Sequence, residues 1–388
     1  MLSNIPRMNV ISFLFHMQFF AAVTVPFFTE WGGLTFQETL LLQSWFVLCW
    51  AAFEVPTGAF ADRFGRKKSI ILGCFTVAAG AFIYGSIPDI RAFVLAEALW
   101  ALGNAFISGA DEAIIYDTLK TFRMQARSKK VFARYSMTLP LAFVIASPLG
   151  SIIASKYGLN YPMLFSGIPM IFAGLLALTL KEPAHGRRAQ HKKSYISLII
   201  DCASYIRKHP KLRPLVIDSV IGGVLLYYIL WFYQVMLKNA GASIDSYGWV
   251  SAGMNIFSMV LLARLLQIEK ILGKKNLIRA TIIIPGIAFV WGAYTKNLAL
   301  TLVLVFAIMG ARALRGPLFS SYFNIHIESG RRATMLSAIS MMGRISAALT
   351  NVAVGALMDW SVGGTMVAIG LAAVALAIFS GVSESHLE

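Results

Sequence analysis

The sequence predicts an all-α membrane protein with twelve transmembrane helices in two pseudo-symmetric six-helix bundles. Of its 388 residues, 57% are hydrophobic and only 13% are charged, which leaves too little polar surface to cover a water-soluble globule. The apolar residues fall into runs of about 20, the helix length that crosses a hydrocarbon core about 30 Å thick. The Lys and Arg residues gather in alternate loops, as expected when only one side of a membrane receives them.

Helices are preferred to barrel strands because the apolar runs are long and uninterrupted, whereas barrel strands are short and alternate in polarity. The first run, which contains His16 and Gln18, is too long for a signal-peptide core and lacks a small-residue cleavage site, so we expect a retained helix. The predicted spans are residues 8–29, 38–60, 69–88, 91–115, 134–155, 160–180, 214–236, 247–268, 277–295, 298–322, 334–357 and 363–382.

The net charge of +16 could indicate nucleic-acid binding, but the positions of the basic residues along the chain give a different explanation. Most of them follow the even-numbered spans, and few follow the odd-numbered ones. The positive-inside rule then predicts an inner (plasma) membrane protein with both termini and the central loop in the cytoplasm. We expect the lipid bilayer as a partner and no nucleic acid, and the three cysteines imply no disulfide framework.

The chain divides around its longest polar stretch. We predict an N-terminal bundle over residues 1–180, a cytoplasmic linker over 181–213 and a C-terminal bundle over 214–388. Within the linker, Ser194 to Lys208 has the spacing of an amphipathic surface helix, and a solvated basic segment is the equally good alternative. A shift of 208 positions superposes Gly65-Arg66-Lys67 on Gly273-Lys274-Lys275, in register with the spans. Such duplication around a midplane site is how many carriers are built.

One motif fills the end of the second span and the loop after it, from Gly58 to Lys68. Gly58 would allow close helix approach, Gly65 would allow a tight turn, and Asp62 places an anion at a helix end. The basic residues would hold the loop in the cytoplasm. A basic loop obeying only the positive-inside rule explains the arginines and lysines but leaves the glycine and aspartate spacing unexplained.

At these residues the chain resembles the major facilitator superfamily, whose signature between helices two and three reads Gly-x-x-x-Asp-Arg-x-Gly-Arg-Lys. The resemblance implies a monomeric secondary transporter that works by alternating access, is no enzyme and uses no cofactor or metal. It also implies that Asp62 holds the two halves together in the outward-facing state, through arginines and the end of helix eleven. The residues of this implied conformational latch are Gly58, Asp62, Arg63, Gly65, Arg66 and Lys67.

Several ionisable residues lie inside predicted spans, where each costs at least about 2.5 kcal/mol on insertion scales. Glu97, Asn104, Ser108 and Asp111 follow one another at intervals of seven, four and three, which puts them on one face of an ideal helix, with Glu112 beside it. We expect this polar stripe to face water or the other bundle.

Three arginines, Arg312, Arg315 and Arg344, also lie deep within spans. They could bind an anionic or zwitterionic substrate, because a guanidinium matches a carboxylate or phosphate. They could equally pair with acidic side chains and stabilise the packing of the bundles. The candidate acidic partners are Asp111, Glu112 and Asp218.

Proton coupling would need a carboxyl group within the membrane, and the candidates are Glu54, Asp111 and Glu112. For Glu54 a packing hydrogen bond between helices is the alternative. Trp231 and Gln234 lie on a span expected to line the cavity, although aromatic residues there often belong to the core or the lipid belt. The candidate substrate-binding residues are Glu97, Asn104, Ser108, Trp231, Gln234, Arg312, Arg315 and Arg344.

The favoured hypothesis is proton-coupled export of an amphipathic or drug-like compound. Leu99 and Leu102 stand where drug exporters of this family carry arginine and glutamine, and residues 147–151 keep only part of the antiporter motif. Proton-coupled uptake or exchange of an organic anion or another small metabolite is therefore the alternative. A channel or receptor would not require the duplication, and the chain lacks the metalloprotease, hydrolase and phosphate-loop motifs of enzymes.

Overall fold

A computed structural model of the protein describes residues 2–182, 195–328 and 331–387, and within them all regular structure is helical. Ten helical segments are long and apolar enough to cross a membrane, and a shorter apolar helix covers Tyr161–Ala177. The helix over Lys274–Gly292 begins with two lysines and accounts for the remaining predicted span. The predicted all-α membrane fold is confirmed.

The chain forms two compact units. Unit 1 comprises Met1–Leu34, Leu42–Lys192 and Ile244–Ala252, and unit 2 comprises Thr35–Leu41, Lys193–Ser243 and Gly253–Glu388. Residues 183–194 of the predicted linker lie outside the described residues, as does the start of the predicted amphipathic segment at Ser194. The described part of the linker contains the helix α10 (Tyr195–Lys208).

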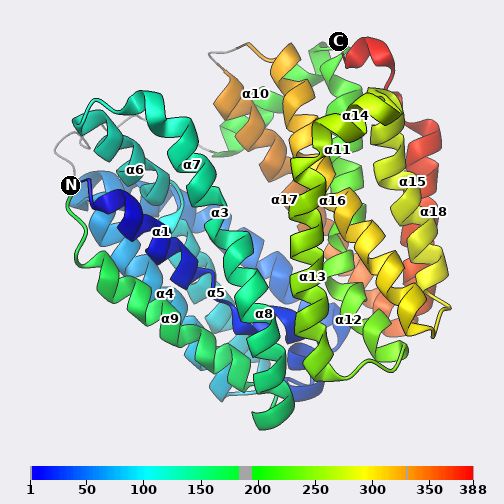
Figure 1. Ribbon diagram of the computed structural model, residues 1–388, viewed down its shortest axis with the longest axis horizontal. Coiled ribbons are helices and arrows are strands. Elements are labelled where there is room, and N and C mark those ends of the chain that lie inside the picture. Colours follow the sequence, from blue (N-terminus) through cyan, green and yellow to red (C-terminus); the bar gives the residue numbers. More distant parts are fainter. Residues whose placement is uncertain (1, 183–194, 329–330, 388) are drawn as a thin grey trace. The chain divides into compact units, whose positions relative to one another are not determined.

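The first half of the chain begins with a broken span, followed by helices that Figure 1 shows in blue to green. Its elements are α1 (Asn4–Phe15), η1 (Phe19–Val23), α2 (Thr24–Pro26), η2 (Phe27–Trp31), α3 (Phe36–Phe64), α4 (Arg66–Ser86), α5 (Ile90–Ile107), α6 (Ala110–Thr121), η3 (Gln125–Arg127), α7 (Ser128–Ser136), α8 (Thr138–Tyr157) and α9 (Tyr161–Ala177).

In unit 1, α4 packs between α5 and α9 (Figure 1). The α4–α5 contact is close because two glycines face each other: a β-carbon on Gly73 or on Gly103 would come within 2.7 Å of the other's carbonyl oxygen. Glycine at such a crossing lets two backbones approach and gain dispersion contacts over a longer interface.

The second half of the chain continues from the linker helix to the C-terminal segment. Its elements are α10, α11 (Leu212–Tyr227), α12 (Ile229–Asn239), α13 (Ile244–Ala263), α14 (Leu265–Leu272), α15 (Lys274–Gly292), α16 (Leu298–His326), α17 (Arg332–Trp360), α18 (Val362–Phe379) and η4 (Glu384–His386). In unit 2, α15 packs on α16 and α18, α11 packs on α16 and α17, and α10 lies against α17 and α11.

Local sequence explains where several helices begin and break. Gly65 and Gly273 have φ values of +102° and +79° and directly precede α4 and α15. These are the two positions that the shifted alignment superposes, and only glycine adopts such backbone angles at low cost. The predicted single span 91–115 is two helices, because Ser108 and Gly109 interrupt it between α5 and α6. The span 214–236 is likewise interrupted at Tyr228.

Candidate functional site

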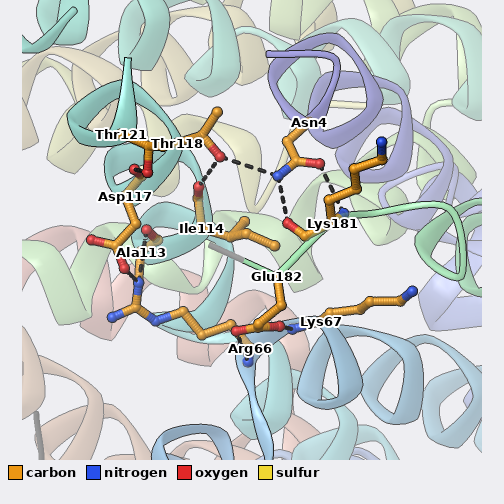
Figure 2. Close-up of polar contacts among 10 residues, drawn as sticks. All are labelled: Asn4, Arg66, Lys67, Ala113, Ile114, Asp117, Thr118, Thr121, Lys181 and Glu182. Atoms are coloured by element: carbon orange, nitrogen blue, oxygen red, sulfur yellow. Dashed lines mark hydrogen bonds and ion pairs between the residues drawn. The ribbon is translucent and has the colours of Figure 1, made fainter. Parts of the chain in front are cut away.

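The loop between α3 and α4 is held by a carboxylate. Glu182, which follows α9, accepts hydrogen bonds from the backbone N–H groups of Arg66 and Lys67 at 2.9 and 2.8 Å. Figure 2 shows this carboxylate at the first turn of α4. The first amides of a helix lack intrahelical partners and carry partial positive charge, so a carboxylate there satisfies two of them.

The Arg66 side chain ties the same loop to α6. Its guanidinium forms an ion pair with Asp117 and donates to the carbonyl oxygen of Ala113 at 3.0 Å (Figure 2). At the residue that follows Asp117, Asn4 donates to the Thr118 hydroxyl at 3.1 Å, and it also donates to the carbonyl oxygen of the residue before Glu182 at 2.8 Å. Four segments distant in sequence therefore meet at this end of unit 1.

The other predicted latch residues are more exposed. Asp62 is exposed and interacts electrostatically with Arg66, but it forms no hydrogen bond with a described residue. Arg63 lies over the Phe64 ring, 5.2 Å from its centroid. The close approach expected at Gly58 is wrong for this conformation, because a β-carbon there would meet no described atom within 4 Å. The latch role itself stays a prediction.

The broken fourth span carries two carboxyl groups in different surroundings. Glu97 on α5 is only 6% exposed and accepts a hydrogen bond from Gln43 of α3 at 2.8 Å. The buried phenol of Tyr84 on α4 lies close to the same carboxyl, and Phe93 packs against that phenol with ring centroids 5.1 Å apart. No lysine or arginine of the described chain forms an ion pair with Glu97.

Asp111 lies beyond the break, in the first turn of α6. It accepts a hydrogen bond from the Tyr135 hydroxyl at 2.6 Å and from the backbone N–H of Glu112 at 2.7 Å. His16 is close enough to interact electrostatically with Asp111, and its Nδ1 lies 2.7 Å from the carbonyl oxygen of Ser12. Asp111 therefore has an aromatic hydroxyl and an imidazole for neighbours, both of which can exchange protons.

The predicted polar stripe is divided by the helix break. Asn104 donates to the carbonyl oxygen of Trp100 at 2.8 Å within its own helix, and Ser108 is exposed at the C-cap of α5. Glu112 is exposed beside Asp111, and Glu54 on α3 is half-buried. The predicted stripe is therefore not one continuous polar face.

In unit 2 one predicted arginine forms a buried ion pair. Arg315 on α16 donates to Asp218 Oδ1 of α11 at 2.5 Å and to the Asp218 carbonyl oxygen at 2.8 Å. It also donates to the Thr281 hydroxyl at 3.1 Å, and its guanidinium lies over the Phe319 ring at 4.8 Å. Ser380 donates to the second Asp218 oxygen at 2.6 Å. Of the alternatives stated for this arginine, the structure shows the acidic pairing.

The other predicted unit 2 residues lie apart from that pair. Arg312, one turn before Arg315, is half-buried near Tyr227 and has no hydrogen-bond acceptor or ion-pair partner among the described residues. Arg344 on α17 is exposed. Trp231 and Gln234 on α12 are buried, and Gln234 donates to the neighbouring Tyr233 hydroxyl at 2.9 Å. Residues 2–182, 195–328 and 331–387 contain no cluster of metal ligands.

Sequence reasoning missed the groups that fix the candidate residues. Asp117 and Glu182 anchor the motif loop, and Gln43 and Tyr135 hold the two carboxyl groups. Glu182 carried a weak signal, because it is an acidic residue at the end of an apolar run. Its partner is 116 positions away, which no local pattern reveals.

The fold and the motif loop define a polytopic helical membrane transporter built from two units. The sequence profile of the Major Facilitator Superfamily matches residues 8–351. The chain belongs to this family, and it is a member of a class that moves solutes across membranes.

Similar proteins agree with that assignment. The uncharacterized MFS-type transporter YxaM of Bacillus subtilis (strain 168) is 25% identical over 314 residues, which cover 78% of this chain and 76% of that one. Multidrug resistance protein 2 of the same organism is 27% identical over 329 residues, covering 78% and 77%. Among solved structures, the nucleoside transporter NupG matches with a TM-score of 0.81 at 14% identity, covering 97% of each chain; at that identity the likeness shows the fold alone.

Proposed function

We propose that this chain is a plasma-membrane secondary transporter that exports an amphipathic, drug-like compound in exchange for protons. One observation carries the proposal: Glu97 and Asp111, on the two halves of the broken fourth span, are hydrogen-bonded by uncharged groups and form no ion pair with a described lysine or arginine. The name of the similar multidrug resistance protein supports export as the direction.

The chemistry follows from the cost of charge within a membrane. An ionised carboxylate at the site of Glu97 has the Gln43 amide and the nearby Tyr84 phenol as uncharged neighbours, and no described lysine or arginine forms an ion pair with it. Its ionisation becomes favourable only when water reaches it, so proton release is linked to opening of the unit toward one side. Asp111, next to a half-buried histidine and a tyrosine, provides a second group for proton transfer.

The experiment measures dye export by inside-out vesicles under an imposed pH gradient, with ethidium as the probe. We expect Glu97→Gln and Asp111→Asn to lose the response to the pH gradient while retaining exchange of unlabelled for labelled dye. Glu384→Gln, which alters an exposed carboxyl, is the control and should behave as the parent. A full pH-gradient response in both membrane variants would contradict proton coupling through these groups.

Asp62 is proposed to act as the latch of the transport cycle, as the family resemblance implies. Its exposure at the end of α3 leaves the carboxylate accessible for a partner that forms in another conformation. Asp62→Asn should slow turnover and leave substrate affinity nearly unchanged. Parental turnover in this variant would remove the latch role.

A second candidate function is uptake or exchange of an organic anion, and Arg312 favours it. Its guanidinium is half-buried in α16 with no acidic partner among the described residues, so a bound carboxylate or phosphate would supply the missing counter-charge. Thermal-shift titration with a panel of organic anions tests this function. If the chain transports an organic anion, the anion that stabilises the parent should no longer stabilise Arg312→Gln. If no anion stabilises the parent, export of a drug-like compound is the better-supported function.

A further inference from the structure

A cavity of about 480 Å³ on unit 2 lies where α10 ends, α11 begins and α18 ends. Three cations line it: Arg207 and Lys208 from the last turn of α10, and Arg213 from the first turn of α11. All three side chains are exposed. None of them forms an ion pair with a described residue, so no described carboxylate neutralises the positive charge of these three side chains.

Part of the cavity lining is apolar, and this apolar wall is formed by side chains of α11 and α18. Ile217 on α11 is 44% exposed and Phe379 on α18 is 83% exposed, and both line the cavity. Ile221, one turn further along α11, and Ile378, directly before Phe379 on α18, are also exposed. Because α11 and α18 belong to spans long enough to cross a membrane, we expect this wall to be accessible to acyl chains.

One carboxylate lies among the lining residues, and it does not cancel the cations. Asp218 is 2% exposed, accepts from Arg315 at 2.5 Å and from Ser380 at 2.6 Å. Its charge is therefore compensated from within unit 2. The cavity lining therefore combines cationic and apolar side chains.

We propose that this cavity binds an anionic phospholipid, with the phosphate against Arg207, Lys208 and Arg213 and an acyl chain along Ile217 and Phe379. Guanidinium and ammonium groups are the donors that phosphate esters prefer, and basic pockets at the ends of transmembrane helices suit anionic headgroups. A free phosphate would satisfy the cations but would leave the apolar wall without a ligand. The proposal assigns this cavity to a bound lipid, and none of the carboxyl groups proposed for proton coupling lines it.

The test titrates the purified full chain in mild detergent with phosphatidylglycerol or phosphatidylcholine, and it follows bound lipid by native mass spectrometry and stability by thermal shift. The parent should retain phosphatidylglycerol in preference to phosphatidylcholine. Combined Arg207→Gln, Lys208→Gln and Arg213→Gln should weaken phosphatidylglycerol binding on the order of 100-fold, at about a fivefold loss per charge. Soluble glycerol phosphate should give no stabilisation at concentrations where the lipid saturates.

A matched control removes three exposed cations from η3 and α7 of unit 1, through Arg127→Gln, Lys129→Gln and Lys130→Gln. This variant has the same net charge as the cavity variant and should bind the lipid as the parent does. A second variant, Ile217→Trp, fills the apolar wall and leaves the cations in place; it should also lose retained lipid.

The variants and the soluble phosphate ester distinguish specific lipid binding from unspecific charge attraction and from binding of a soluble phosphate. Equal lipid binding by the parent and the cavity variant would overturn the proposal, as would equal loss in the unit 1 control, which would indicate only unspecific charge attraction. Stabilisation by glycerol phosphate that survives Ile217→Trp would replace the lipid with a soluble phosphate ester.

Discussion

Breaking the ion pair between Arg315 and Asp218 should destabilise the protein severely, whereas replacing both partners should not. The two side chains are 4% and 2% exposed, so neither charge can be rehydrated when its partner is removed. Asp218→Leu alone leaves a buried guanidinium, and Arg315→Met alone leaves a buried carboxylate. The double variant with Asp218→Leu leaves no charge at all.

The magnitude follows from the contacts. Loss of one partner of a buried pair costs about 3–5 kcal/mol, and loss of the 3.1 Å bond to Thr281 adds about 1 kcal/mol in the Arg315 variant. A well-packed apolar pair of similar volume is often neutral or slightly stabilising. We therefore expect each single variant to lose about 4 kcal/mol and the double variant to recover most of that loss.

The assay is equilibrium unfolding in detergent micelles of increasing sodium dodecyl sulfate content, followed by circular dichroism, for the parent, both single variants and the double variant. Single-variant losses below about 1 kcal/mol would refute the structural role. So would a double-variant loss equal to the sum of the two. The substrate-binding interpretation of Arg315 predicts the opposite pattern, with stability unchanged and ligand affinity lost.

Three further predictions concern other parts of the chain. Glu182→Gln removes the negative charge at the start of α4, and the interaction of that charge with the helix end is worth about 0.3–1 kcal/mol. Hydrogen exchange of the Arg66 amide should therefore accelerate up to roughly fivefold at low salt. An unchanged exchange rate would show that the contact is not formed in solution. Gly150→Ala places a methyl group against main-chain atoms of the first span and should lower the free energy of unfolding, measured by thermal unfolding, by at least about 1–3 kcal/mol. Gly58→Ala, with open space around it, is the control and should be tolerated. Equal stability of the two variants would exclude the close crossing at Gly150. Burial raises the pKa of the Cys202 thiol to about 11, so at pH 8 the thiolate fraction is roughly 100-fold below that of an ordinary cysteine. The rate of site-resolved maleimide labelling should therefore be low, and it should rise about tenfold per pH unit up to that pKa. Fast labelling at pH 8 would show that α10 is not docked against the rest of unit 2.

The fold could be predicted because its signals are local. Each span is a run of apolar residues, and the turn glycines Gly65 and Gly273 are followed directly by basic residues in the sequence. Both glycines have the positive φ that the tight turn requires. Hydrophobic length and turn chemistry depend on a few consecutive residues, so they can be evaluated without knowing what packs where.

The surroundings of the candidate residues could not be predicted in the same way. The prediction of a polar stripe required one continuous helix, but Ser108 and Gly109 interrupt it. Glu97 is therefore hydrogen-bonded to a side chain of α3 and Asp111 to a side chain of α7. The Ser-Gly dipeptide was a visible sign of weak helix propensity. The outcome still depended on tertiary packing, which decides whether a membrane helix tolerates a break.

The buried carboxyl groups of the two units differ in one respect that bears on coupling. Asp218 in unit 2 is compensated by a guanidinium at 2.5 Å, and protonating it would strand that cation in an apolar interior. Glu97 in unit 1 has uncharged neighbours, the Gln43 amide donor at 2.8 Å and the Tyr84 phenol, and a proton on it removes a charge without stranding another. Any proton that drives transport should therefore bind in unit 1. We expect Asp218→Asn to lower the stability of the protein, while transport by the folded fraction keeps its dependence on the pH gradient. Glu97→Gln should keep the parental stability and lose that dependence. The reverse pattern, measured by unfolding and vesicle transport on the same preparations, would assign the coupling to unit 2 instead.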